Sequence, residues 1–208
     1  MIASEAAARA FCAERTDAEG LARLGQLAEW LEAENARQNL VSSASLANLW
    51  QRHFADGLQL LVHARGGQGP WLDLGSGAGF PGLPLAIARP DDQFILVESR
   101  RRRVEWLNRC IDGLGLAHCH VIGGRLASVE SFAAGAITAR AFAPLAKLLR
   151  LSARFSTPAT VWLLPKGRSA AQELAEQPAA VGQMFHVEPS ATDSAGGILV
   201  GRGVSPTS

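Results

Sequence analysis

The sequence predicts an α/β protein with a doubly wound, mostly parallel sheet, preceded by helices and closed by an antiparallel hairpin. Two observations predict this fold. From residue 71 onward, short apolar runs alternate with helical patterns, which is typical of βαβ units in a parallel sheet. The first of these runs leads into a glycine-rich turn at 75–79 and then a helix start. Such a turn at the carboxyl end of a strand indicates a cofactor site.

The N-terminal third is expected to be helical. Thr16 and Glu19 have the spacing of a capping box, and an apolar stripe follows at Leu21, Leu24, Leu27 and Leu31. A second helical pattern follows Ser43 and runs to the glycine-rich break at 66–70. We therefore expect an N-terminal helical extension over 1–65, packed on an α/β domain over 66–208, with both parts forming one structural unit.

The strands of the sheet are predicted from apolar runs between turn signals. Five parallel strands are expected at 71–74, 94–98, around 120–122, 136–140 and 160–164. Two further short strands, 183–187 and 198–201, have no convincing helix between them. They predict an antiparallel hairpin at the end of the sheet.

Length and composition limit the class of protein. With 208 residues and 48% hydrophobic content, the chain can bury a full core. Cys12, Cys110 and Cys119 form no C-x-x-C pair, which favours a reducing compartment and argues against a structural zinc. Charged residues interrupt the N-terminus, and no apolar run approaches membrane-spanning length. We expect a cytoplasmic protein with no metal and no membrane contact.

The glycine turn indicates which cofactor is bound. Gly75, Gly77 and Gly79 remove the Cβ atoms from the turn, so a ligand can approach the backbone and amide N–H groups can face it. The dinucleotide fingerprint requires a glycine where this chain has Phe80, and Asp73 would repel a pyrophosphate. S-adenosylmethionine lacks phosphate and carries a sulfonium and an ammonium group. An acid beside the turn therefore favours S-adenosylmethionine over NAD.

Glu98 supports this interpretation, because it ends the next predicted strand, where a carboxylate can accept hydrogen bonds from both ribose hydroxyls. Taken alone, Glu98 is a solvated strand end and the glycine turn is an ordinary connection between a strand and a helix. Taken together, the residues predict a cofactor site that includes Gly75, Gly77, Phe80 and Glu98.

Charge is distributed unevenly along the chain. The net charge is −5 over residues 1–99, +9 over 100–168 and −3 over 169–208. This pattern predicts a polyanionic partner bound on one side, and the alternative is a solvated face rich in arginine. Four arginines open a helix, where positive charge opposes the helix dipole, and two cations follow the predicted strand 160–164. The candidate RNA-binding residues are Arg100, Arg101, Arg102, Arg103, Lys166 and Arg168.

The residues after the fourth predicted strand indicate the chemistry. The segment 140–144 carries neither the Asn/Asp-Pro-Pro-aromatic motif of amine methyltransferases nor a cysteine nucleophile. The target atom therefore needs no activation, and guanine N7 fits because its lone pair is already nucleophilic. We expect no catalytic acid or base. Arg140 is interpreted as a cofactor or substrate-positioning residue, with a structural ion pair as the alternative, and His53 as a packed, hydrogen-bonded side chain.

Several motifs together resemble a known family: Asn39-Leu40-Val41-Ser42, Arg52-His53-Phe54-Ala55-Asp56, the glycine segment from Leu72 to Pro84, Arg102-Arg103-Val104, Arg140-Ala141-Phe142 and Leu164-Pro165-Lys166-Gly167. The chain resembles the bacterial 16S rRNA guanine-N7 methyltransferases, the RsmG family, formerly called glucose-inhibited division protein B. The similarity extends from about Trp30 to Val204, and the glycine motif followed by Phe-Pro-Gly-x-Pro is its most specific part.

The resemblance implies a Rossmann-like class I methyltransferase. S-adenosylmethionine would be bound by Gly75 and Phe80, by the backbone at Leu126 and Ala127, and by Arg140. The implied substrate is a guanine in the decoding-region loop of 16S rRNA, within a 30S subunit or an assembly intermediate. We expect the protein to be a monomer.

The sequence departs from the family pattern after the third predicted strand. The family commonly has Arg-x-acid there, whereas Gly124-Arg125-Leu126-Ala127 lacks the acid. Two other classes stay open from the residues alone: a methyltransferase of a small molecule or protein, and a non-catalytic nucleotide-binding module.

Overall fold

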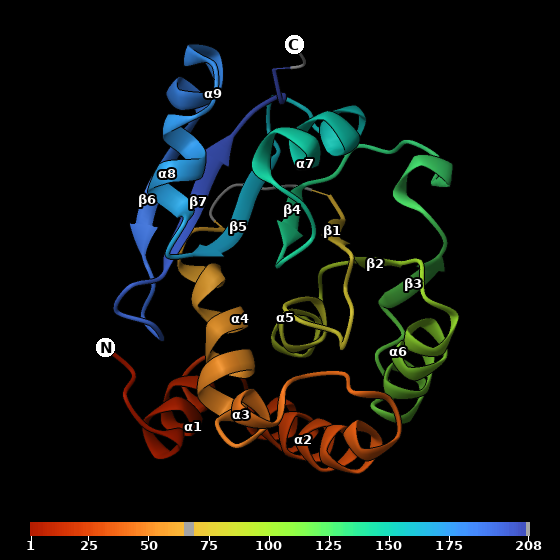
Figure 1. Cartoon of the computed structure of the whole chain (residues 1–208). Coiled ribbons are helices and arrows are strands. Elements are labelled where there is room, and N and C mark those ends of the chain that lie inside the picture. The colour runs from red at the N-terminus through yellow and green to blue at the C-terminus, as the bar shows by residue number, and fades with distance from the viewer. Residues whose placement is uncertain (65–68, 207–208) are drawn as a thin grey trace.

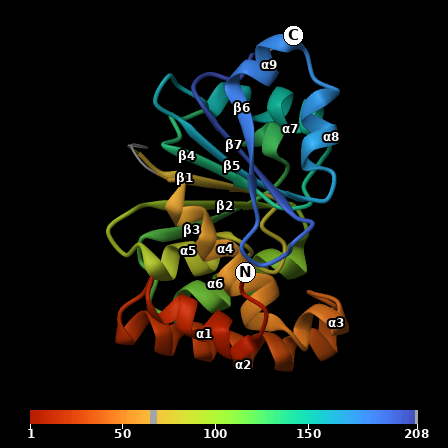
Figure 2. The same cartoon turned by 90° about the vertical axis from the view of Figure 1, so that its left-hand side faces the viewer.

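A seven-stranded sheet lies between two layers of helices (Figures 1 and 2). The computed structural model describes residues 1–64 and 69–206. Along the sheet the strand order is β3-β2-β1-β4-β5-β7-β6. The strands are β1 (Trp71–Leu74), β2 (Phe94–Glu98), β3 (Cys119–Gly123), β4 (Ala136–Ala139), β5 (Val161–Gly167), β6 (Phe185–Pro189) and β7 (Gly197–Arg202).

The first five strands are parallel, which confirms the predicted doubly wound arrangement. Trp71 of β1 pairs with Phe94 of β2 on one side and with Ala136 of β4 on the other. The chain therefore moves outward from β1 to β3 and then returns beside β1 with β4. In sheets of this kind the ligand lies beyond the carboxyl ends of the strands at that reversal.

The last two strands form the predicted antiparallel hairpin, with β7 between β5 and β6. Its first strand begins two residues later than predicted, because Gln183 and Met184 complete a short helix before it. No helix occurs in the described connection between the two strands, as expected.

The helices are divided between the two faces of the sheet (Figure 1). One face carries the helical N-terminal segment and the helices that follow β1 and β2; the other carries the helices that follow β4 and β5. The first group comprises α1 (Glu5–Ala13), α2 (Ala18–Gln38), α3 (Ser43–Leu46), α4 (Asp56–Leu58), α5 (Gly82–Ala88) and α6 (Arg101–Gly113), and the second α7 (Leu145–Ser152), α8 (Ala170–Ala175) and α9 (Ala179–Met184).

Helix α2 begins as predicted but has a different cap. Its N-cap is Asp17, whose Oδ1 accepts a hydrogen bond of 2.7 Å from the Gly20 N–H. The Thr16 hydroxyl instead donates to the Cys12 carbonyl at the end of α1. The predicted capping box at Thr16 is therefore wrong, because that hydroxyl satisfies one of the free carbonyls of the preceding helix.

The second helical pattern begins with α3 at Ser43, one residue before the predicted start. It is interrupted by a π-helical turn, η1 (Trp50–Ala55), and a 3₁₀ turn, η2 (Gln59–Val62), follows α4. The Glu5 carboxylate accepts hydrogen bonds of 2.9 Å from the N–H groups of Trp50 and Gln51. These are free donors at the start of η1, so α1 fixes where that turn begins. Two further 3₁₀ turns are η3 (Leu126–Ser128) and η4 (Ala153–Phe155).

The N-terminal helices share one apolar core with the sheet. Leu24, Leu27 and Leu31 of α2 are completely buried and belong to the same cluster as Leu83 and Phe94. The predicted domain boundary between 65 and 66 lies outside the described residues. In the described part of the chain, the helical segment packs as an integral layer of the domain.

Three further observations concern the sequence predictions. No helix within 1–64 and 69–206 is long and apolar enough to cross a membrane. The same residues contain no group of three or more metal-ligating side chains placed to hold a metal ion. Cys12, Cys110 and Cys119 are free and buried.

The shared core predicts that Leu24→Ala destabilises the whole domain. Loss of this buried side chain should lower the free energy of unfolding by about 3 kcal/mol, in one cooperative transition followed by circular dichroism in urea. Val62→Ala is the matched control: its side chain is 54% exposed, so the change should stay within about 0.5 kcal/mol. A separate early transition for the helical segment would contradict a shared core.

Candidate functional site

The glycine turn follows β1 at the reversal of the sheet. Gly75, Gly77 and Gly79 have φ angles of +66°, +61° and +103°, a region that L-residues with a Cβ avoid. A Cβ on Gly75 would lie 2.6 Å from the ring of Phe142. The turn therefore needs glycine both for its backbone conformation and for the close approach of the segment after β4.

The amide groups of this turn are used within the protein. The N–H groups of Gly75 and Ser76 donate to the Val97 carbonyl, and those of Gly79 and Phe80 donate to the Ser76 carbonyl. The prediction that the turn's amides face a ligand is therefore wrong for these residues. A turn whose donors are already satisfied is a poor site for a pyrophosphate, which argues further against a dinucleotide.

Glu98 connects the turn to the next helix. Its side chain is buried, with Oε2 accepting from the Gly77 N–H at 2.9 Å and Oε1 from the Arg100 N–H at 2.8 Å. Arg100 is the N-cap residue of α6. A carboxylate has lone pairs beyond these two bonds, so the predicted contact with ribose hydroxyls stays a prediction.

Asp73 lies buried beneath the turn, 1% exposed. Its Oδ1 accepts a hydrogen bond of 2.9 Å from the Thr138 hydroxyl. Its Oδ2 lies against Gly82 and accepts no side-chain hydrogen bond among the described residues. Burial raises the pKa of Asp73 to about 6, opposed by hydrogen bonds from Ser76 and Thr138. At neutral pH the site therefore contains a negative charge that a cationic ligand would stabilise.

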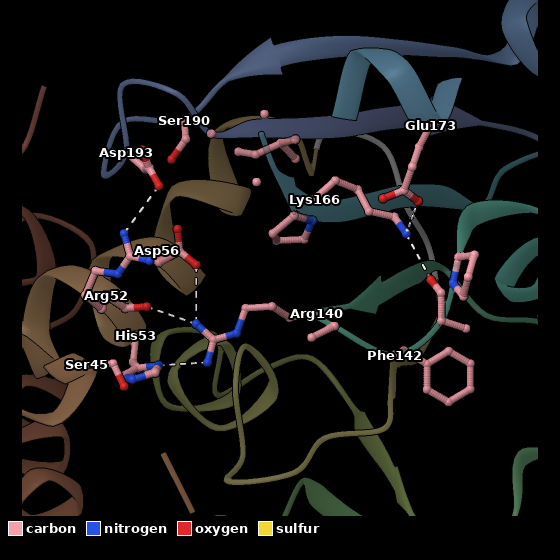
Figure 3. Close-up of a pocket in the computed structure, with 18 residues that line it drawn as sticks. Ser45, Arg52, His53, Asp56, Arg140, Phe142, Lys166, Glu173, Ser190 and Asp193 are labelled. Atoms are coloured by element: carbon pink, nitrogen blue, oxygen red, sulfur yellow. Dashed lines mark hydrogen bonds and ion pairs between the residues drawn. The ribbon is translucent and has the colours of Figure 1, made fainter. Parts of the chain in front are cut away.

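Arg140 follows β4 and points toward the helical segment (Figure 3). Its guanidinium donates to the Arg52 carbonyl at 2.9 Å and to His53 Nδ1 at 2.7 Å, and forms an ion pair with Asp56 at 3.4 Å. The ion pair that was the alternative interpretation is thus present. A cofactor contact by Arg140 stays a prediction.

His53 is packed and hydrogen-bonded, as predicted. Its ring is buried and stacks on Phe80 with centroids 4.6 Å apart. Burial, with the adjacent charges of Arg140 and Arg52, lowers the pKa of His53 to about 3. His53 is therefore neutral near pH 7. The ring of Phe80 is occupied by stacking on His53, so a cofactor contact by Phe80 would involve its main chain.

A pocket of about 930 Å³ opens beyond the carboxyl ends of β4 and β5. Its walls come from the N-terminal segment, the residues after β4, the end of β5 and the loop between β6 and β7 (Figure 3). Side chains of both charges line it: Arg52, Asp56, Arg140, Lys166, Glu173 and Asp193, together with His53, Phe142 and Ser190. Phe142 joins this pocket to the cofactor turn, because its ring rests on Gly75.

Lys166 and Arg168 differ in their surroundings. The Lys166 ammonium donates to the Ala143 carbonyl at 3.0 Å and to Glu173 at 2.9 Å, and its side chain is 9% exposed. The structure thus uses Lys166 to hold the segment after β4, which is at odds with the predicted phosphate contact. Arg168 is exposed and is the cation of this pair that a phosphate can reach.

The four arginines of the predicted RNA-binding group lie at the start of α6, as expected. Arg100, Arg101 and Arg102 are exposed, and Arg101 pairs with Glu105 at 2.9 Å. Arg103 is half-buried, and its guanidinium lies 3.4 Å from the position of a Cβ on Gly77. Arg103 therefore borders the glycine turn.

Leu126 and Ala127, the two residues after β3 that are predicted to contact the cofactor, lie in η3. Leu126 is buried, and its carbonyl accepts from Arg154 at 2.5 Å, while Ala127 is exposed. Neither lines the pocket described above. Their backbone contact with a cofactor stays a prediction.

The sequence interpretation did not assign Arg52, Phe142 or Asp193 to the pocket. Arg52 and Phe142 lie inside motifs shared with the resembled family, so position within those motifs was an available signal. Asp193 lies in the loop between β6 and β7, where no motif marked it.

The parallel sheet, the glycine turn at its reversal and the adjacent pocket define the fold of a class I S-adenosylmethionine-dependent methyltransferase. Solved structures agree in fold: a SAM-dependent methyltransferase from Aquifex aeolicus has a TM-score of 0.58 at 15% identity, covering 80% of this chain and 96% of that chain. MtNAS in complex with S-adenosylmethionine has a TM-score of 0.52 at 19% identity, covering 95% and 77%.

The family model for rRNA small subunit methyltransferase G, GidB, matches residues 21–196, and the chain belongs to this family. The ribosomal RNA small subunit methyltransferase G of Erythrobacter litoralis is 58% identical over the full length of both chains. That of Zymomonas mobilis is 41% identical, covering 90% of this chain and 88% of the relative. The family resemblance inferred from the motifs is confirmed.

Asp73 predicts a specific pH dependence of stability. Its folded-state pKa, about 6, lies above the ordinary value of 3.8 for an aspartate, so the folded state binds the proton more tightly than the unfolded chain does. The wild type should gain about 2 kcal/mol of unfolding free energy relative to Asp73→Asn as the pH falls from 7 to 4. Urea titrations of both proteins at each pH measure this difference; a constant difference would contradict the raised pKa.

Proposed function

We propose that this chain transfers the methyl group of S-adenosylmethionine to N7 of a guanine in 16S rRNA. Membership in the rRNA small subunit methyltransferase G family supports the reaction. The observation that carries the proposal is the pocket beside the glycine turn, because a base bound there would lie next to a cofactor bound at the turn.

The residues at the turn fit a cationic cofactor without phosphate. Asp73 supplies a buried carboxylate oxygen without a side-chain partner, and the turn's amides are satisfied internally. We propose Gly75, Gly77, Phe80, Glu98, Leu126, Ala127 and Arg140 as the residues around the cofactor. When bound, S-adenosylmethionine supplies a methyl carbon that a nucleophile can attack. The protein's part is to position the base and exclude water.

Guanine N7 fits the groups that line the pocket. Its lone pair attacks without losing a proton, so no general base is needed. Each carboxylate lining the pocket is paired with a cation: Asp56 with Arg140, Glu173 with Lys166 and Asp193 with Arg52. His53 already accepts from Arg140 through Nδ1. These groups are arranged to hold a base, and the methyl transfer leaves a positive charge on the purine that the carboxylates offset.

The exposed cations support a polyanionic substrate. Arg100, Arg101 and Arg102 are exposed at the start of α6, next in the chain to Arg103, and Arg168 follows β5. Other cations of residues 100–168 make contacts within the protein. Arg109 pairs with Glu34, and Arg154 donates to the Leu126 carbonyl. We propose that the exposed group contacts rRNA phosphates within a 30S subunit or an assembly intermediate, and that the enzyme acts as a cytoplasmic monomer.

The proposal predicts a labelled methyl group on one guanine of 16S rRNA. Labelled S-adenosylmethionine is supplied with 30S subunits, naked 16S rRNA, tRNA or a metabolite pool, and the product is mapped by mass spectrometry. Label in the 16S rRNA of one of the first two substrates, at guanine N7, is expected. Label confined to metabolites or to protein would favour the alternative class, and no label in any RNA would reject the proposal.

Neutralising the exposed arginines tests the RNA contact. Changing Arg100, Arg101 and Arg102 together to Gln should weaken RNA binding and reduce the slope of log K against log salt by about 2, or about 0.7 for each lost phosphate contact. Fluorescence anisotropy in a KCl series measures the slope. The control, Lys147→Gln with Arg150→Gln, neutralises exposed cations of the same charged segment on α7 across the sheet. Equal slopes for the arginine variant and the wild type would reject the contact.

A further inference from the structure

We propose that Asp193 selects guanine over other bases, by accepting hydrogen bonds from N1–H and from the 2-amino group of the substrate base. This inference rests on the proposed function and adds a specificity-determining residue to the same pocket.

The position of Asp193 suits this role. Phe142 rests on the cofactor turn through Gly75, whereas Asp193 lies on the opposite side of the pocket, in the loop between β6 and β7 (Figure 3). In guanine, the 2-amino group lies across the base from N7, and N1–H is next to it on that far side. A guanine that presents N7 to the cofactor turn therefore presents N1–H and the 2-amino group toward Asp193.

The Asp193 carboxylate is held in place and keeps one oxygen accessible, whose two lone pairs can accept from two neighbouring donors. Its Oδ1 accepts from the Ala195 N–H at 3.0 Å, and the Asp193 carbonyl accepts from Gly196 at 2.9 Å. Its Oδ2 faces the pocket with Arg52 Nη1 at 3.4 Å, a long contact, and the side chain is 31% exposed. The Ala195 bond and Arg52 lower the pKa of Asp193, so this carboxylate accepts hydrogen bonds and donates none near neutral pH.

The other two carboxylates of the pocket have fewer free lone pairs. Asp56 accepts from Gln59, Thr192 and Arg140. Glu173 accepts from Lys166, from the Leu145 N–H and from Ser169. Both are used to hold the walls of the pocket together, which leaves Asp193 as the acceptor for a ligand.

A carboxylate distinguishes guanine from adenine by charge and by donor pattern. Guanine offers two adjacent donors, N1–H and the 2-amino group, whereas adenine has a lone pair at N1 that the carboxylate repels. Bases taken out of a stack are commonly recognised at this edge. Asp193 would therefore act on specificity without touching the reacting atoms.

The test compares guanine with inosine, which lacks only the 2-amino group, at the methylated position of 16S rRNA assembled by ligation. For the wild type, kcat/KM should be about tenfold lower with inosine, from the loss of one base-edge hydrogen bond. In Asp193→Asn, Oδ1 can still accept from the Ala195 N–H, while an NH₂ donor replaces Oδ2. For this variant kcat/KM with guanine should fall about tenfold. The ratio of kcat/KM for guanine to that for inosine should fall to within about twofold of unity.

Arg52→Gln is the matched control, because it breaks the same ion pair and leaves the acceptor. It should keep the preference for guanine, whatever its effect on rate. Thermal unfolding and calorimetric binding of S-adenosylmethionine verify that each variant folds, with Asp193→Ala as a second variant. A wild-type preference that persists in both Asp193 variants would overturn the inference. Failure of the wild type to methylate any rRNA would instead overturn the proposed function.

Discussion

The guanidinium of Arg140 holds together the two halves of the pocket. It lies where β4 ends, and its partners Arg52, His53 and Asp56 all belong to the helical N-terminal segment. A cation in such a position must be paired and hydrogen-bonded, because removing either partner leaves an uncompensated charge. The pairing fixes the helical segment at the carboxyl edge of the sheet. Phe80 extends the contact, because it stacks on His53 and lies 5.4 Å from the guanidinium.

A second constraint is the internal satisfaction of the glycine turn. Val97, Ser76 and Glu98 accept five of the turn's amides, those of Gly75, Ser76, Gly77, Gly79 and Phe80, so the protein's own hydrogen bonds hold the turn. Asp73 lies buried beneath the turn, and one of its carboxylate oxygens accepts no side-chain hydrogen bond among the described residues. A turn with a carboxylate beneath it differs in charge from a phosphate-binding loop, although both follow the first strand of a similar sheet.

The sheet was predictable because its apolar runs are short and bounded by turn residues, so β1 and β2 begin and end where the sequence indicates. The N-cap of α2 was not predictable, because the Thr16 hydroxyl donates to the Cys12 carbonyl at the end of α1. That contact depends on how the two helices are placed. The segment from α8 to β6 has only a weak apolar periodicity, so the strand predicted at 183–187 begins two residues before β6. At the site, Glu98 and Arg140 follow from their places at strand ends. The buried pair of Lys166 with Glu173 and the position of Asp193 depend on the hairpin, which brings distant parts of the chain together.

The pocket is assembled from residues 45–56 and from residues 140–198, whereas the glycine turn and its Glu98 support lie within 75–100. Domains generally fold as units. Because β4 pairs with β1 and the helical segment shares the core of the sheet, the glycine turn and the pocket belong to the same folding unit. The lining of the pocket reaches Ile198, so a nascent chain that ends before the final hairpin lacks one wall of the pocket.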